Sequence, residues 1–268
     1  MKFTLDGNTS SNELITIDRN NLSNNIWFTT EYASGVSVNG KIGNFQYNTG
    51  LYSGGSVYAA QSRFEDSSKE FGNFNGGNFW LIGVGYDFGR QLGVKQALLR
   101  ADFVYNPPDT QDNATKNFSE IGSLNFQLDA GKWGVSADLA AANGSDGQSD
   151  VGGAVVMPWF KFNDKLQLVG RYTYLSSADP NGISFNRYEN VAAVNYNPNG
   201  TYKTNSFGKV SSQRGDEYNE VYLGLNYYLY GHRLKVQTGW NYTWMSDSAN
   251  NGGDYSGWGW TTGVRFYF

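Results

Sequence analysis

Residues 257–268, GWGWTTGVRFYF, decide the fold class of this chain. From Trp258 to Phe268 the even positions are mostly bulky and apolar, whereas the odd positions hold glycine, threonine, arginine or tyrosine. Successive side chains of a β-strand point to opposite faces, so this alternation predicts a strand with one apolar and one polar face. Residues 220–230 and 233–245 alternate in the same way. The C-terminal part of the chain is therefore predicted to be a run of amphipathic strands.

The same test, applied to all 268 residues, predicts eleven strands and one all-β domain spanning residues 1–268. Residues 1–5 are expected to end a further strand. Pro158 makes the strand at 151–162 the weakest prediction, because proline donates no hydrogen bond to a β-ladder. The predicted strands are 34–42, 44–53, 78–89, 95–106, 121–131, 132–142, 151–162, 165–177, 220–230, 233–245 and 258–268.

The predicted connections alternate between short and long. Short ones fall at 43, 90–94, 131, 163–164 and 231–232, and long ones at 6–33, 54–77, 107–120, 143–150, 178–219 and 246–257. Trp133 and Phe45 lie beside short turns, and Trp240 and Trp244 approach a long loop, as in the aromatic girdles of membrane barrels. These features predict a transmembrane antiparallel β-barrel, with 11–12 strands in this chain, in the bacterial outer membrane.

Composition excludes several other classes of protein. No apolar run approaches the roughly 18 residues that a transmembrane helix needs. The chain has no cysteine and one histidine, His232, so neither a metal site, a cofactor nor an enzyme with a nucleophilic triad is expected. A net charge of −4 without a basic run argues against nucleic acid as a partner. The N-terminus does not have the pattern of a signal peptide.

Several stretches resemble the phosphate-selective porin O and P family of outer-membrane porins. The resemblance covers essentially the whole chain and is strongest over its last hundred residues. It is carried by GVGYDFG at 83–89, RYTY at 171–174, RYEN at 187–190, GDEYNEVYLGLNYYLYGH at 215–232 and the C-terminal stretch at 257–268.

This resemblance implies a 16-stranded trimeric porin with a long third loop folded inward to narrow the pore. Counting back from the last strand places residues 6–33 at this constriction loop, and Arg19 aligns with a basic position on it. The first four strands of the family barrel and its signal peptide are expected to be missing from this sequence. The implied function is passive diffusion of small anions, phosphate or polyphosphate, through a water-filled lumen.

Charge is distributed unevenly along the chain. The predicted long loops hold 18 of the 24 acidic residues but only 8 of the 20 basic ones, so the barrel wall and the short turns are net basic. By strand parity, seven basic residues share the polar, lumen-facing side. Rings of arginine and lysine select anions in pores, and guanidinium groups suit phosphate oxygens. With Arg19, the candidate anion-binding residues are Lys41, Arg100, Lys165, Arg171, Arg233, Lys235 and Arg265.

Each candidate has a purely structural alternative. Inward-facing acids, namely Asp87, Asp129, Asp138 and Glu220, would pair with the basic residues, as Asp102 would with Arg100, and stiffen the wall. Arg19 has the same alternative, a salt bridge to Asp18 or Glu13 that anchors its loop. At the level of the whole protein, the alternatives are a general non-selective porin, an adhesin barrel, or a soluble carbohydrate-binding β-sandwich.

Overall fold

Eleven long strands form one continuous antiparallel sheet in the computed structural model. The model describes residues 13–26, 35–53, 78–107, 118–184, 214–249 and 255–267. The strands are β1 (Gly35–Ile42), β2 (Phe45–Ser53), β3 (Asn78–Asp87), β4 (Gln96–Tyr105), β5 (Phe118–Asp129), β6 (Trp133–Gly144), β7 (Val151–Lys161), β8 (Leu166–Ser177), β11 (Glu217–Tyr228), β12 (Leu234–Ser246) and β13 (Tyr255–Phe266).

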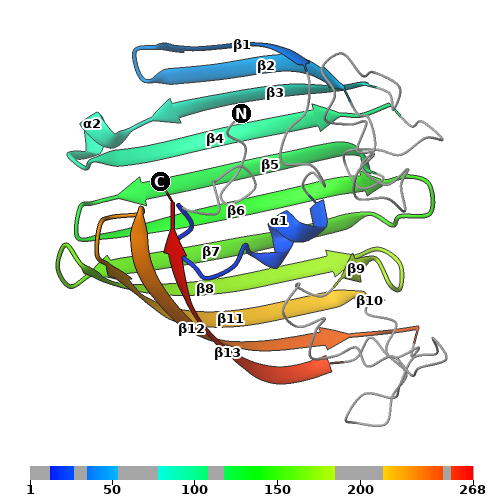
Figure 1. Cartoon of the computed structure of the whole chain (residues 1–268). Helices are drawn as coiled ribbons and strands as arrows, with labels where there is room; N and C mark the ends of the chain where they lie inside the picture. The colour runs from blue at the N-terminus through cyan, green and yellow to red at the C-terminus, as the bar shows by residue number, and fades with distance from the viewer. Residues whose placement is uncertain are drawn as a thin grey trace.

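The sheet is a meander, in which each long strand pairs with its neighbours along the chain, from β1 at one edge to β13 at the other. Figure 1 shows that the sheet is curved and that helix α1 (Asn21–Ile26) lies over it. The connections after β1, β3, β5, β7 and β11 gather at one end, on the left in Figure 1, and are tight; the connection after β3 includes helix α2 (Gly89–Leu92). The three longest connections, 54–77, 106–117 and 178–216, belong to the opposite end. The last of these contains the short paired strands β9 (Ile183–Ser184) and β10 (Arg214–Gly215).

The sequence prediction of eleven strands is confirmed, with boundaries that differ by no more than three residues. The predicted strand end at residues 1–5 lies outside the described residues. Pro158 does not break β7, but pairing with β8 is interrupted beside it, between Val156↔Tyr172 and Trp159↔Val169. Pro158 remains paired with Val135 of β6 on the other side. The missing N–H of proline therefore weakens one ladder and leaves the strand intact.

Side chains alternate strictly between the two faces of the sheet. In β3, Trp80, Ile82 and Val84 are exposed on the convex face, whereas Phe79 and Leu81 are buried on the concave face. In β13 the even positions predicted to face lipid are exposed, and Trp258 is 79% exposed. The convex face thus carries a continuous band of exposed apolar side chains. Such a band is stable in contact with lipid hydrocarbon and not in contact with water.

Exposed aromatic rings mark both ends of the convex band, in agreement with the predicted girdles. Their amphipathic rings suit the two interfaces of a bilayer. At the long-loop end they include Trp80, Tyr105 and Trp258, and at the short-turn end Phe45, Tyr86, Phe88, Trp133, Phe160, Phe162, Tyr230 and Phe266.

Helix α1 packs on the concave face over β6, β7 and β8. Leu22 and Ile26 are fully buried there, within the same apolar cluster as Ala140 and Ala142 of β6. Leu22 Cδ1 lies 3.0 Å from the position that a Cβ atom on Gly153 would take. Small residues in β6 and β7 thus make the room that the helix occupies. No helix in the described part of the chain is long and apolar enough to cross a membrane.

The facing of the strands is testable with a matched pair of substitutions in β5. Leu124 is exposed on the convex face, and Gln127 lies on the concave face of the same strand. We expect Leu124→Arg to lower the free energy of unfolding by about 2 to 4 kcal/mol, the cost of placing arginine in the lipid midplane. Gln127→Arg should cost little, because its position is already polar. Urea titration of the protein folded in lipid measures both, and equal losses would contradict the assignment.

Candidate functional site

Residues 13–26, here called the inward segment, lie along the concave face of the sheet. They are the described part of the predicted constriction loop 6–33; residues 6–12 and 27–33 lie outside the described residues. The first half of the inward segment contacts side chains of β8, β11, β12 and β13, and its second half is α1. The segment therefore covers the concave side of the C-terminal strands.

Five successive backbone carbonyls of the inward segment, from Leu14 to Asp18, each accept a hydrogen bond from a side chain of the wall. A chain segment outside regular structure needs such partners, because its own backbone supplies none. The donors are Lys235 Nζ and Gln237 Nε2 to Leu14, Asn226 Nδ2 to Ile15 at 2.7 Å, Gln237 Nε2 to Thr16 at 3.3 Å, Arg265 Nη2 to Ile17 and Arg171 Nη1 to Asp18 at 3.0 Å. The wall thus fixes the inward segment through its backbone.

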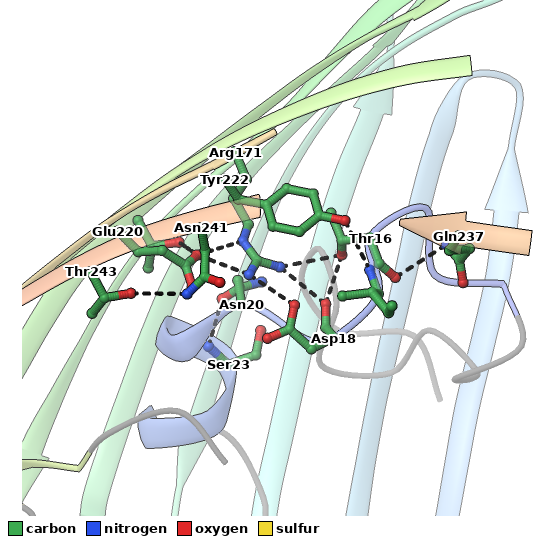
Figure 2. A network of polar contacts seen from close by, with 12 residues as sticks. Thr16, Asp18, Asn20, Ser23, Arg171, Glu220, Tyr222, Gln237, Asn241 and Thr243 are labelled. Atoms are coloured by element: carbon green, nitrogen blue, oxygen red, sulfur yellow. Dashed lines mark hydrogen bonds and ion pairs between the residues drawn. The ribbon is translucent and has the colours of Figure 1, made fainter. Parts of the chain in front are cut away.

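Arg171 of β8 is the centre of this arrangement, and Figure 2 shows its guanidinium between Asp18 and Glu220. Its Nε donates to Glu220 Oε1 at 2.8 Å, and Nη2 lies 2.8 Å from the same oxygen. Nη2 also donates to Asp18 Oδ1 at 3.0 Å, and Nη1 donates to Thr16 Oγ1 at 3.2 Å as well as to the Asp18 carbonyl. The guanidinium therefore donates four hydrogen bonds and forms ion pairs with two carboxylates. The Arg171 side chain is 0% exposed.

Glu220 of β11 is buried with Arg171 and is held by further hydroxyl groups. Tyr218 donates to Glu220 Oε2 at 3.4 Å, and Thr173 donates to Oε1 at 3.5 Å. The ring of Tyr222 lies 4.9 Å from the Arg171 guanidinium, and its hydroxyl accepts the Ile17 N–H at 3.3 Å. A buried ion pair of this kind strongly resists loss of one partner, because the other charge would remain buried alone.

A second network, rich in amides, holds the start of the inward segment at the short-turn end. Gln167 Oε1 accepts from Tyr228 at 2.6 Å and from Asn226 at 3.0 Å, and Gln237 donates to Asn226 Oδ1 at 2.9 Å. The fully buried Lys235 Nζ lies 3.2 Å from Nδ1 of His232. Charge patterning alone does not predict the role of these three amides; the sequence signal for it is their inward parity on the strands.

Polar residues of α1 tie the inward segment to β9. Asn20 caps the helix, its Oδ1 accepting the Ser23 N–H at 2.8 Å. Asn25 accepts the Ser184 N–H at 2.8 Å and donates to the Ser184 carbonyl at 3.1 Å, and Asn21 donates to the same carbonyl at 2.9 Å. The loop between β8 and β11 thus contributes to the seat of the inward segment.

The structure brings together only some of the predicted anion-binding residues. Arg171, Lys235 and Arg265 each bind the inward segment. Arg100 lies apart on the concave side of β4 and pairs with Asp102, Nη2 to Oδ1 at 2.6 Å, which is the structural alternative considered for it. Arg19 lies half-buried in the inward segment, Lys41 occupies a concave-face position paired with Gln46, and Lys165 and Arg233 are exposed in short turns outside the strands.

Arg100 differs from Arg171 in how many of its guanidinium nitrogens form hydrogen bonds. Its Nε and Nη2 are engaged by Asp102, whereas Nη1 has no hydrogen-bond partner among the described residues. Its neighbours on the concave face are polar and include Asn125, opposite it on β5, and Asn48. Within the described residues, no cluster of three or more histidine, aspartate or glutamate side chains could hold a metal ion.

Comparison with known proteins finds likeness in structure. No protein-family model matches the chain, and no curated protein does. OccK5 (OpdH) of Pseudomonas aeruginosa is 14% identical with a TM-score of 0.53, over 91% of this chain and 64% of that one. The outer-membrane expressed OmpT of Vibrio cholerae is 12% identical with a TM-score of 0.51, over 97% and 74%. The outer membrane channel DcaP of Acinetobacter baumannii is 10% identical with a TM-score of 0.45, over 86% and 60%.

These likenesses establish the fold. The chain has the antiparallel fold of an outer-membrane β-barrel, and the bacterial outer membrane is the location that belongs to this fold. The chain spans about two thirds of the length of OccK5. The alternative of a soluble β-sandwich is wrong, because the described long strands form one sheet and not two packed sheets.

The Arg171 anchor is testable by substitution. In Arg171→Met, Glu220 and Asp18 lose their buried cation, and we expect a loss of about 3 to 5 kcal/mol in the free energy of unfolding. We also expect the inward segment to detach, which limited trypsin digestion reports as faster cleavage after Arg19. Arg100→Met is the matched control, since it removes an inward ion pair that does not touch the inward segment. Equal cleavage rates in the two variants would contradict the anchoring role.

Proposed function

We propose that this protein is an outer-membrane porin for passive diffusion of small anions, such as phosphate, through a water-filled lumen that the inward segment narrows. The observation that carries the proposal is the attachment of the inward segment to the concave wall by five successive carbonyls. A segment held this firmly keeps a fixed cross-section for diffusing solutes. A channel is favoured over an enzyme, because the lumen side is built from amides, hydroxyls and ion pairs.

Preference for anions is supported by Arg100. Its Nη1 group faces no competing acceptor in the described structure, and arginine binds oxyanions through two parallel N–H groups. The inward segment lies over β6, β7 and β8 and contacts β11, β12 and β13, so solutes would pass along the side of the concave face that carries Arg100. Arg19, on the inward segment, is proposed to supply the opposing positive charge.

A general non-selective porin is the second candidate, and a specific observation favours it. Arg171, Lys235 and Arg265 are engaged by the inward segment, and Asp102 partly neutralises Arg100. Three of the eight basic residues predicted to attract anions thus bind the inward segment, and a fourth pairs with an acid of the wall. Among the described candidates, selectivity would then depend mainly on Arg100, Arg19 and Lys41.

Membership of the phosphate-selective porin O and P family, with its 16 strands and trimeric assembly, is proposed on the sequence resemblance. The inward segment is consistent with the constriction loop of that family. Small anions and outer-membrane lipid are the partners that follow from the proposal.

Current through the protein in a planar lipid bilayer tests anion preference. Under a KCl gradient we expect a reversal potential of anionic sign, and Arg100→Gln and Arg19→Gln should each shift it toward cations. We also expect phosphate to block Arg100→Gln about tenfold less tightly, the factor for one lost charge-assisted hydrogen bond. The control is Arg214→Gln, which removes the same charge from β10 in the loop after β8.

The outcomes separate the candidates. Cation preference of the unmutated pore, or equal shifts in Arg100→Gln and Arg214→Gln, would overturn anion selectivity and leave the general porin. Absence of any conductance from correctly folded protein would overturn the channel itself.

A further inference from the structure

Four of the short turns repeat one combination, an exposed aromatic ring followed or preceded within three residues by an exposed basic residue. The turns after β3, β5, β7 and β11 combine Phe88 with Arg90, Trp133 with Lys132, Phe162 with Lys165 and Tyr230 with Arg233. These four basic residues, Arg90, Lys132, Lys165 and Arg233, are here called the turn cations.

The turn cations are not neutralised by neighbouring acids in the described structure. Asp87 accepts the backbone N–H groups of Gly89 and Ala97, and Asp129 pairs with Lys95 at 3.1 Å. None of the turn cations has an ion-pair partner among the described residues. Within the described part of the chain, Asp87 and the exposed Asp164 are the acids of these turns that have no ion-pair partner.

Hydrogen bonds hold the turns in place, so the turn cations start from fixed backbone positions. Asn163 Oδ1 accepts the Lys165 and Leu166 N–H groups, both at 2.9 Å. The Lys132 carbonyl accepts from Lys161 at 2.7 Å, and the Arg233 N–H donates to the Tyr230 carbonyl at 3.1 Å. Binding of a ligand to the turn cations therefore orders only their side chains. The entropic cost of this binding is lower than if the backbone also had to be ordered.

The turns are also regularly spaced along the sheet. Neighbouring strands lie about 4.8 Å apart, so consecutive short turns, two strands apart, repeat about every 10 Å. The adjacent aromatic rings belong to the girdle that marks the depth of the membrane interface. Long basic side chains at this depth reach the headgroup phosphates while their methylene stems stay near the apolar boundary.

We propose that the turn cations form a docking surface for anionic phospholipids, each binding the headgroup phosphate of a lipid in the leaflet around the short-turn end. Charge complementarity selects this occupant, since basic side chains at a membrane surface attract anionic lipids. The opposite end is unsuited to it, because acids such as Asp146, Asp150, Asp179 and Asp247 predominate over bases in its described loops.

Lipid enrichment around the folded protein tests the proposal. The protein is reconstituted in phosphatidylcholine vesicles containing a minor fraction of phosphatidylglycerol and extracted with its surrounding lipid by a polymer that forms native nanodiscs. We expect phosphatidylglycerol to be enriched over its share in the vesicle. Each turn cation replaced by glutamine should weaken local binding by about fivefold, so the variant R90Q/K132Q/K165Q/R233Q should lose the enrichment.

The matched control keeps every charge, as R90K/K132R/K165R/R233K, and should keep the enrichment. High salt should abolish it in the unmutated protein, which provides a test that needs no variant. Enrichment that persists in the glutamine variant or at high salt would overturn the proposal. So would a change in anion selectivity of the glutamine variant without a change in enrichment, because that result would indicate a site for free anions.

Discussion

The arrangement of the concave face depends on one constraint: a backbone segment that leaves the sheet must find hydrogen-bond partners for its carbonyl groups. The wall supplies them from inward positions of β8, β11, β12 and β13, and Arg171 additionally binds the Asp18 carboxylate. Because Glu220 holds the same guanidinium from the opposite side, the inward segment and the wall share one buried ion pair. Loss of the cation would release both at once.

This constraint determines which inward-facing positive charges are engaged within the protein. The Arg171 guanidinium donates four hydrogen bonds and pairs with two carboxylates, so it is fully committed to Glu220 and the inward segment. Asp102 binds the Arg100 guanidinium on one side only, and Nη1 of Arg100 makes no hydrogen bond among the described residues. Two arginines of equal parity and equal charge thus have different contacts, because Arg171 holds the inward segment and Arg100 pairs with Asp102 apart from it.

The sheet also places opposite charge at its two ends. Basic residues gather in the tight turns beside exposed aromatic rings, and acidic residues gather in the long loops. Alternation of the strands keeps both groups out of the apolar convex band, where a charge would be costly. The exposed apolar side chains, the basic turns and the attachment of the inward segment therefore occupy separate surfaces of one sheet.

The sequence by itself determined the strands, their facing and their order, because period-two alternation and turn residues are local properties, as residues 257–268 illustrate. It also placed Arg100 beside Asp102, two residues apart on one face of a strand. Only the tertiary structure decided that Arg171 meets Asp18, 153 residues away, and that Gln237, Asn226 and Lys235 bind backbone carbonyls of the inward segment. Such contacts depend on where a remote, irregular segment comes to lie, and no local periodicity encodes that position.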